Sequence, residues 1–566
     1  MPKDHDAVAL KAAFKKQLAK KSKKVQQVLP LEEKRIKLAP HVVVEARAGT
    51  GKTTTCCGAV EQILGIAPKF TPSQQQTDIW NLIGQEKPNN IGVCAFSKII
   101  QTELERRLPY DTVEVRTCHS FGCKILWNDN RTKYSKHNDY KTSGIIQKLT
   151  GMTPVDLKKK MKVSLYGACD LVQFAKYNLI DPFSEDRLLH AEMFQLFADN
   201  GIDMMGCDPD KTIEVAIQAF RKSCTTEPNQ RGYEHIPERD FADMIWLPIV
   251  LDIEPTTKYD LLIVDESQDL NRCQQELVCR LGRRLVLVGD PKQAIFAFAG
   301  ADCQSMPRMT ERLKDTKRGV VTLPLNTTYR CGKKIVQAAQ RFVPDYQAYE
   351  KNPDGEIFSG LPEEHLVRHL NDGDMVLCRI NAPLVSLCFS LLSCDKKAYI
   401  QGRDIGAGLV KMIEKSKTQT VDEFDLWLHD WYQTERERLL RKKVKSETAL
   451  MNLSDKCRMM RVFTEKVRLD AQNQDRTPTI SALISLITNL FSDDKAGIRL
   501  SSIHRAKGLE ADNVYIIRPE KLPHPMAKTP QAREQEDNLH YVAITRAIKK
   551  LTYCRTPDKE EDEFDE

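Results

Sequence analysis

Short runs of apolar and often β-branched residues recur along the chain, and most are separated by longer mixed segments. The runs lie at residues 41–45, 90–96, 259–265, 284–290, 374–379, 498–503 and 513–518. Continuous apolar runs of this length are typical of strands buried on both faces of a parallel sheet, with helices in the connections. Because the runs fall into two groups, before residue 305 and after residue 320, the pattern predicts an α/β protein with two parallel-sheet cores.

The 566 residues leave room for several domains. At about 100–200 residues per domain, three or four are expected. Residues 125–235 and 395–480 lack strand-like runs, so we expect a mainly helical insertion in each core. The predicted division is a basic tail at 1–34, a first core at 35–124 and 236–305, a second core at 306–394 and 481–556, and an acidic tail at 557–566.

The composition is that of a soluble globular protein, with 41% apolar and 29% charged residues. It excludes collagen-like, mucin-like and wholly disordered chains. The net charge of +7 is a mild excess that is compatible with a polyanionic partner. The longest uncharged stretch, residues 380–394, contains Asn and Ser and is shorter than the about 18–20 apolar residues of a membrane span.

The cysteines and the N-terminal sequence bear on the compartment. The seventeen cysteines are scattered without a C-x-x-C pair, which favours reduced thiols that serve as small apolar residues. The N-terminus lacks the apolar stretch of a secretory signal. We therefore expect a protein that is cytoplasmic (nucleoid-associated) or nuclear, is not secreted and has no membrane partner.

The first chemical signal follows the run at 41–45 and begins a plausible helix. It reads Ala46, Arg47, Ala48, Gly49, Thr50, Gly51, Lys52, Thr53 and Thr54. This is the phosphate-loop pattern with Ala in place of the first Gly. Small residues let backbone N–H groups wrap the phosphates, and the helix N-terminus adds a favourable dipole. Lys52 is expected to bind the β- and γ-phosphates, and the Thr53 hydroxyl to coordinate Mg²⁺.

The second signal is an acid pair, Asp265 and Glu266, directly after the apolar run LLIV. The carboxyl end of a strand is where an α/β sheet places catalytic groups. We expect Asp265 to hold Mg²⁺ and Glu266 to polarise the attacking water as general base. Paired acids at a strand end can also be simple solvated charges, but the upstream phosphate loop favours the hydrolytic interpretation. Together the two signals predict a Mg-nucleotide hydrolase.

Further motifs stand in a fixed order across residues 45–550. They are AFSK at 95–98, TCHSF at 117–121, DESQD at 265–269, VGDPKQAIFAFAG at 288–300, TYRC at 328–331, SIHRAKGLE at 502–510 and EDNLHYVAITRA at 536–547. In this order they resemble motifs Ia, Ib, II, III, IV, V and VI of superfamily 1 helicases of the UvrD/Rep type. The resemblance implies two RecA-like P-loop domains with parallel sheets and ATP in the cleft between them, each carrying a mainly helical insertion.

The resemblance also implies roles for residues that would be unremarkable alone. Gln293 would sense the γ-phosphate and link it to the DNA groove, and Arg330 and Arg546 would act as arginine fingers from the second core. Tyr329 would stack on adenine, and Glu510 would lie near the ribose and γ-phosphate. Without the motif order, Arg330 reads equally well as an ordinary surface arginine.

The same resemblance implies a DNA-binding groove lined by side chains that stack on bases or bind phosphates. The candidates are Phe96, Thr117, His119, Phe296 and Phe298 on the first core and Ser502 and His504 on the second. Taken alone, Phe296 and Phe298 read as core aromatics. Phe298 stands where the family usually has Trp, and Ala299 where it often has Arg. Stacking and backbone contacts carry little base information, so sequence-independent and salt-sensitive binding is expected.

The glutamine that reads adenine in this family is not evident. Gln26 and Gln27 lie near the expected distance before Lys52 but lack the family's context. The segment at 70–76 (FTPSQQQ) looks more like that motif, yet it follows the phosphate loop. The favoured interpretation of this segment is a surface insertion capped by Pro72 and Ser73 before a helix.

The leading hypothesis is an ATP- and Mg²⁺-dependent DNA helicase that moves 3′ to 5′ on single-stranded DNA in replication, repair or recombination. Its expected partners are single-stranded DNA, junctions of single-stranded and double-stranded DNA, and proteins bound through either tail. Alternatives are a translocase that strips bound proteins but unwinds poorly, an RNA- or DNA-dependent ATPase, and a non-motor binding module. The basic stretch at 436–445 can contact duplex phosphate or be an exposed helix face.

Overall fold

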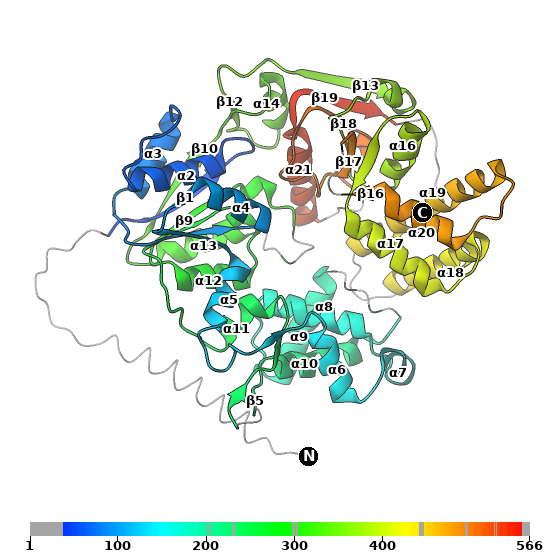
Figure 1. Ribbon diagram of the computed structural model, residues 1–566, viewed down its shortest axis with the longest axis horizontal. Helices are drawn as coiled ribbons and strands as arrows, with labels where there is room; N and C mark the ends of the chain where they lie inside the picture. The colour runs from blue at the N-terminus through cyan, green and yellow to red at the C-terminus, as the bar shows by residue number, and fades with distance from the viewer. Residues whose placement is uncertain are drawn as a thin grey trace, which may run out of the picture.

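The computed structural model describes residues 38–556, except 201, 203, 205, 229–231, 297–299, 301–303, 441–446, 493–495, 526 and 528. Two parallel sheets form two neighbouring cores, and each core carries a bundle of helices (Figure 1). This confirms the predicted fold class. All seven apolar runs named above form strands of these two sheets.

The first sheet has six parallel strands in the order β10-β1-β9-β8-β2-β3. Their bounds are His41–Ala46 (β1), Ile91–Ala95 (β2), Val113–Thr117 (β3), Leu261–Val264 (β8), Leu285–Gly289 (β9) and Val320–Leu325 (β10). Around them lie α2 (Lys52–Ile63), α3 (Gln74–Ile83), α4 (Lys98–Arg107), α5 (Cys118–Leu126), α11 (Asp243–Val250), α12 (Arg272–Leu281) and α13 (Ser305–Lys314).

The second sheet has seven parallel strands in the order β13-β19-β18-β14-β17-β15-β16. Their bounds are Glu356–Pro362 (β13), Met375–Cys378 (β14), Ala398–Gln401 (β15), Phe491–Ser492 (β16), Ile498–Ser502 (β17), Ala511–Ile516 (β18) and Ala547–Arg555 (β19). Its helices include α14 (Lys333–Ala339), α15 (Leu366–His369), α16 (Ala382–Ser393) and α21 (Pro530–Ile544). A short parallel pair, β11 (Thr327–Thr328) and β12 (Gln347–Ala348), precedes this sheet.

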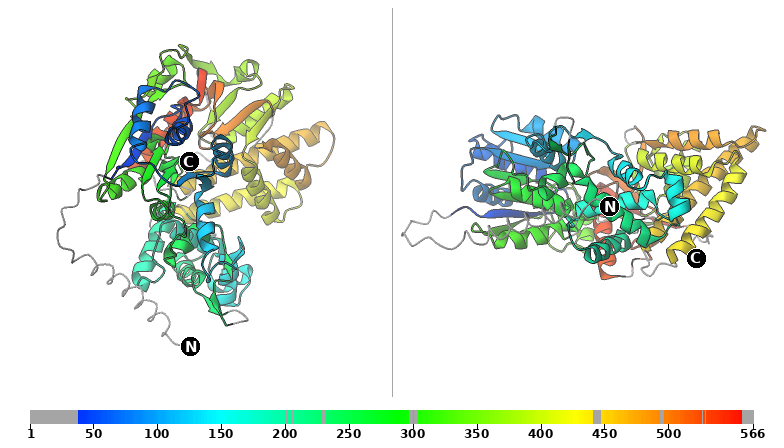
Figure 2. Two further views of the ribbon diagram at one scale, coloured as in Figure 1. Left: turned by 60° about the vertical axis from the view of Figure 1, so that its left-hand side comes forward. Right: turned by 90° about the horizontal axis from the view of Figure 1, so that it is seen from below.

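Each insertion is mainly helical, as the absence of strand-like runs predicted. The first contains α6 (Lys141–Thr150), α7 (Pro154–Asp156), α8 (Leu165–Tyr177), α9 (Asp186–Asn200) and α10 (Pro209–Ser223), with small strand pairs beside them. The second contains α17 (Arg403–Ser416), α18 (Val421–Leu440), α19 (Glu447–Asn473) and α20 (Ile480–Leu490). It lies at the end of the molecule away from the first core (Figure 2).

The structure moves two of the boundaries drawn from sequence. Residues 306–325, which we assigned to the second core, instead contain α13 and β10, and β10 pairs with β1 in the first sheet. Residues 395–401, which we assigned to the second insertion, supply β15 of the second sheet. Strand β10 was missed because most of its side chains are only partly buried and Thr322 and Pro324 interrupt its apolar residues, and β15 because it is four residues long with only Tyr399 and Ile400 buried.

Helices cover both faces of each sheet. Because the strands are parallel, the loops that follow them emerge at one edge of the sheet. Val42 and Val44 point into one cluster with Trp80 of α3, whereas Leu262 and Val264 point into another that continues through the first insertion. A third cluster joins the cores, because Ala48 after β1 packs with second-core residues. The loops after β1, β8 and β9 therefore meet the second core at the carboxyl edge of the first sheet.

Candidate active site at the cleft between the cores

The phosphate loop runs from the end of β1 into the N-terminus of α2. Gly49 and Gly51 have φ angles of +67° and +80°, a left-handed conformation that glycine adopts without a Cβ clash. The Thr50 hydroxyl donates to the carbonyl of Arg47 at 2.9 Å and closes the loop. Ala46 is the buried last residue of β1. The loop thus presents backbone N–H groups and Lys52 at a helix N-terminus, which suits a nucleotide's phosphates.

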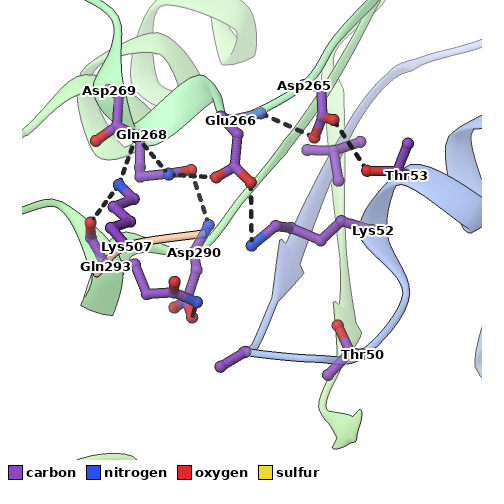
Figure 3. Close-up of polar contacts among 12 residues, drawn as sticks. Thr50, Lys52, Thr53, Asp265, Glu266, Gln268, Asp269, Asp290, Gln293 and Lys507 are labelled. Carbon is purple, nitrogen blue, oxygen red and sulfur yellow. Dashed lines mark hydrogen bonds and ion pairs between the residues drawn. The ribbon is translucent and has the colours of Figure 1, made fainter. Parts of the chain in front are cut away.

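The acid pair at the end of β8 faces this loop (Figure 3). Lys52 Nζ lies 3.6 Å from Glu266 Oε1, and the Thr53 hydroxyl donates to Asp265 Oδ2 at 3.3 Å. A hydroxyl and a carboxylate are oxygen donors of the kind Mg²⁺ prefers, so this donor set fits the expected ion. The hydroxyl of Thr54, the next residue, accepts a hydrogen bond from Arg107 at 3.3 Å.

Burial and neighbouring charges together separate the pKa values of the two carboxyl groups. Burial raises the pKa of Asp265 to about 6, and the neighbouring charge of Glu266 adds to the rise. Burial also acts to raise the pKa of Glu266, but the charges of Lys52 and Lys507 outweigh it and lower that pKa. Glu266 is therefore the residue held as a carboxylate, which is the state a general base requires.

A hydrogen-bonded chain leads from Glu266 to the second core (Figure 3). Gln268 Nε2 donates to Glu266 Oε2 at 2.6 Å and to Asp269 Oδ2 at 2.9 Å. Lys507 of the second core donates to the same Asp269 oxygen at 2.5 Å and to the carbonyl of Gln293 at 2.6 Å. Sequence reasoning named Gln293 but missed Lys507, which stands inside the quoted motif V.

Second-core residues also bind the phosphate loop directly. The Ala48 N–H donates to the Tyr541 hydroxyl at 2.9 Å, and the Tyr346 hydroxyl donates to the Ala48 carbonyl at 2.8 Å. The Tyr329 N–H donates to the Gly49 carbonyl at 3.0 Å. None of these three contacts follows from a sequence pattern, because the partners lie far apart along the chain.

The two predicted arginine fingers lie on the second-core side. Arg330 Nε pairs with Glu510 Oε2 at 2.5 Å, so these two predicted site residues are neighbours. Arg546 is almost completely buried, and its Nη2 lies 3.5 Å from Gln293 Oε1. Burial, together with the charge of Arg330, lowers the pKa of Arg546 to about 10, so it keeps its positive charge at neutral pH.

The Tyr329 side chain remains available for stacking. It is 42% exposed, and its ring centroid lies 5.0 Å from that of Tyr349. Its backbone is fixed at Gly49, so the ring stands beside the phosphate loop. This arrangement fits the role that the family resemblance gives it.

The first-core DNA candidates differ in their surroundings. Phe96 is 39% exposed after β2, whereas the Thr117 hydroxyl accepts from Ser120 N and caps α5. The His119 ring stacks on Phe241 with centroids 3.8 Å apart and an interplanar angle of 18°. Burial lowers the pKa of His119 to about 4, so the ring is neutral at physiological pH. Phe241, half exposed, extends this aromatic surface and was missed because it lies outside the motifs used.

The remaining DNA candidates are less exposed. Phe296 lies under Lys507, whose Nζ is 4.8 Å from the ring centroid. Ser502 is buried at the end of β17, and burial with the charge of Arg379 lowers the pKa of His504 to about 3. The predictions for Phe298, Ala299, Gln26, Gln27, both tails and residues 441–445 fall outside the described residues. Among the helices that the structure does describe, none is long and apolar enough to cross a membrane.

Two domain families match the sequence over the regions that build this cleft. The UvrD/REP helicase N-terminal domain matches residues 31–314, and the UvrD-like helicase C-terminal domain matches residues 409–556. The first match alone covers half of the chain. Together they include the phosphate loop, the acid pair, Glu510 and Arg546.

Several curated proteins are similar in sequence. F-box DNA helicase protein 1 of Schizosaccharomyces pombe is 23% identical over 90% of this chain and 55% of its own length. A probable DNA helicase II homolog of Mycoplasma pneumoniae is 24% identical over 57% of this chain and 43% of its own length. ATP-dependent DNA helicase PcrA of Staphylococcus epidermidis is 32% identical over 22% of this chain and 18% of its own length. The chain spans about half, or less, of the length of these relatives.

Proposed function

The chain belongs to the UvrD/Rep helicase family, and on that premise we propose that it is an ATP-dependent DNA helicase. We propose that it moves 3′ to 5′ along single-stranded DNA and couples ATP hydrolysis to unwinding of the duplex. The observation that carries the proposal is the cleft itself: Lys52 and Glu266 lie on one core, and Arg546 reaches Gln293 beside them from the other.

On the ATP side of the cleft, each residue has a distinct role. Bound Mg-ATP supplies the phosphoryl group that water attacks. Lys52 and the loop N–H groups hold its phosphates, Thr53 and Asp265 hold the metal, and Glu266 accepts the proton of the water. Arg330 and Arg546 offset the negative charge that develops during transfer.

Closure of the cleft links this chemistry to movement. The contacts of Ala48 and Gly49 with Tyr541 and Tyr329 cross between the cores, so a change at the phosphates biases how the cores pack. On the DNA side, Phe96, Phe296 and the His119–Phe241 stack provide surfaces for bases.

The first experiment is ATP hydrolysis with and without single-stranded DNA. We expect DNA to stimulate the wild type strongly, and Glu266→Gln to reduce the stimulated rate by at least about a hundredfold through loss of the general base. Glu311→Gln on the exposed surface of α13 is the matched control and should behave as wild type. Hydrolysis that ignores DNA would contradict the motor and favour a binding module.

Polarity and nucleic acid type need their own measurement. The proposal predicts unwinding of a duplex with a 3′ single-stranded tail and no unwinding of one with a 5′ tail. Unwinding of only the 5′-tailed duplex would overturn the direction. Replacing the DNA strand by RNA tests the RNA-dependent alternative, because stacking and phosphate contacts do not by themselves exclude a 2′-hydroxyl.

A second candidate is a translocase that removes bound proteins and unwinds poorly. It is favoured by the compact second insertion, whose helices span residues 403–490, and by Ala299 at a position where the family often has arginine. Displacement of streptavidin from a biotinylated strand, without unwinding of naked duplex, would support this candidate. For either activity we propose a role in replication, repair or recombination, in the cytoplasm (nucleoid) or nucleus.

A further inference from the structure

The second sheet ends in a strand with an open outer edge. Among the described residues, β13 pairs with β19 alone, and no strand lies on its other side. It runs along the outside of the second core, beside α14 (Figure 1). In a parallel pair, every other residue turns its backbone N–H and C=O towards the partner strand, and the residues between turn theirs outward. β13 therefore presents backbone donors and acceptors that can pair with a further strand.

A groove follows this open edge. A cavity of about 570 Å³ lies between α14 and β13. The consecutive residues 356–358 line it on the β13 side, and Lys334, Gln337 and Ala338 line it on the α14 side. The three helix residues are spaced i, i+3 and i+4, so they belong to one face of α14. A strand edge opposite a helix face is a shape that accepts an extended peptide as an additional strand.

The two faces of β13 offer different contacts. Ile357 packs against the apolar cluster that contains Ile335 and Ala339 of α14, so its side chain lies on the helix side. Because side chains alternate along a strand, Phe358 points to the opposite face. Its ring is 47% exposed, and Lys550 Nζ of β19 lies 4.4 Å from the ring centroid. An added strand would therefore meet an aromatic ring on this face.

The charges beside the groove also differ between the two faces. Lys334 is exposed on the helix side, and its ammonium group has no carboxylate partner in the described part of the chain. The preceding Lys333, by contrast, lies 3.8 Å from Asp354. Glu356, which shares its face of β13 with Phe358, is exposed as well. Acidic side chains of an incoming strand are thus attracted on the helix side and repelled on the Phe358 side.

The edge that can pair is short. The register of β13 with β19 shifts between Ser359 and Leu361, where Gly360 has a φ of +87°. A bulge of this kind ends regular pairing, and Pro362 has no N–H to offer. Pairing is therefore confined to residues 356–359. Stable association of two folded chains buries about 1,200 Å² or more, of which so short an edge supplies only a small part. The groove suits a short extended segment better than a second copy of this chain.

We propose that the groove between α14 and β13 binds an extended segment of a partner protein in which acidic and apolar side chains alternate. The segment adds to the second sheet beside β13, with its acidic side chains towards Lys334 and its apolar side chains towards Phe358. Main-chain hydrogen bonds supply the affinity, and the alternation sets the register. The residues that line this groove are not those of the proposed ATP and DNA sites.

The test is fluorescence anisotropy with the full chain and a labelled peptide of about nine residues in which glutamate alternates with valine. We expect saturable binding to the wild type. Lys334→Glu should weaken it by at least about tenfold, because repulsion replaces attraction. Phe358→Ser should weaken it by about three- to fivefold through loss of the apolar contact. Binding that neither substitution changes would overturn the proposal.

Lys333→Glu is the matched control, because it makes the same charge change one residue away, outside the groove lining. It should keep the wild-type affinity within about twofold, since an exposed charge without direct contact contributes little. Thermal melting of each variant checks that the second core remains folded. Equal losses in both lysine variants, or equal binding of a peptide with the same residues in two blocks, would indicate unspecific charge attraction and contradict the groove.

Main-chain pairing has its own test in two further peptides, one N-methylated at the glutamates and the other at the valines. An added strand turns alternate residues towards β13, so one methylation pattern should abolish binding and the other should preserve it. If both peptides bound equally well or equally poorly, strand addition would be wrong.

Other occupants of the groove give different results. A second copy would appear in sedimentation velocity as a dimer that Lys334→Glu dissociates. If the acidic stretch at 557–566 of the same chain were the occupant, its deletion would tighten peptide binding by at least about fivefold through loss of an intramolecular competitor. Either result would overturn the assignment to a partner protein. The peptide assay requires neither ATP nor DNA, so its outcome is independent of the proposed function.

Discussion

At the scale of single residues, Arg47 is the most heavily connected member of the phosphate loop. Its guanidinium donates to Asp345 at distances of 2.9–3.2 Å and also lies 3.5 Å from Asp290 Oδ1. Asp345 is 43% exposed on the second core, whereas the Asp290 side chain is fully buried on the first. One arginine therefore joins the two cores and balances a buried charge.

The different burial of the two carboxylates gives a prediction for two substitutions. Arg47→Ala should destabilise the protein by about 2–3 kcal/mol, because it removes a cation from beside the buried Asp290 carboxylate. Asp345→Asn should lower the free energy of unfolding by less than about 1 kcal/mol, because the Arg47–Asp345 ion pair is partly solvated. Urea unfolding followed by circular dichroism measures both. Equal losses would show that Asp290 is satisfied by its other hydrogen bonds.

At the scale of elements, α5 and α11, the two first-core helices that flank the first insertion in the sequence, pack closely against each other. A Cβ added to Gly122 of α5 would lie 1.9 Å from the Met244 carbonyl oxygen of α11. The contact is with backbone, which cannot turn aside as a side chain can. Glycine is therefore required here for the close approach of the two first-core helices between which the first insertion lies in the sequence.

We predict that Gly122→Ala destabilises the protein by about 3 kcal/mol or more through this overlap. Gly144→Ala is the control, since Gly144 lies within α6 and nothing stands within 4 Å of its added Cβ. That change should stabilise by about 0.5–1 kcal/mol through higher helix propensity. Thermal melting of the two variants compares them directly, and a stable Gly122→Ala would mean that the two helices can separate without loss.

At the scale of the whole molecule, the two cores meet at the phosphate loop. A Cβ added to Gly49 would lie 2.6 Å from Arg330 Cβ and 2.7 Å from Thr328 Oγ1, both on the segment that joins the sheets. The closed arrangement thus depends on the absence of a side chain at one position. Closure is also what brings Arg546 to Gln293.

Gly49→Ala should therefore hold the cores apart and abolish DNA-stimulated hydrolysis while each core remains folded. Gly65→Ala is the matched control: its φ of +77° imposes similar backbone strain, but its added Cβ meets nothing within 4 Å. Small-angle scattering should show a larger radius of gyration for Gly49→Ala only. A compact Gly49→Ala variant with wild-type hydrolysis would contradict this account of closure.

Much of the fold could be predicted from local pattern. Strands buried on both faces need continuous apolar runs, so residues such as Val42, Leu262 and Val286 mark the two sheets through their local sequence alone. Strand β10 was not recognised because it is mostly half-exposed and interrupted by Thr322 and Pro324, and β15 because its buried part is only two residues long. The hydrolytic residues were also evident, because phosphate and metal chemistry requires particular residue types at fixed spacing around Lys52 and Asp265.

The sequence by itself determined the two-core α/β class and the chemical groups that the cleft contains. Only the tertiary structure decided which groups touch: Ala48 with Tyr541, 493 residues apart, and Gln75 with Asn326, 251 residues apart. It likewise brought Phe241 onto His119. The physical reason is that a strand or a phosphate loop is specified by neighbours along the chain. A contact between cores is specified by how two packed surfaces fit, and no short stretch of sequence encodes that fit.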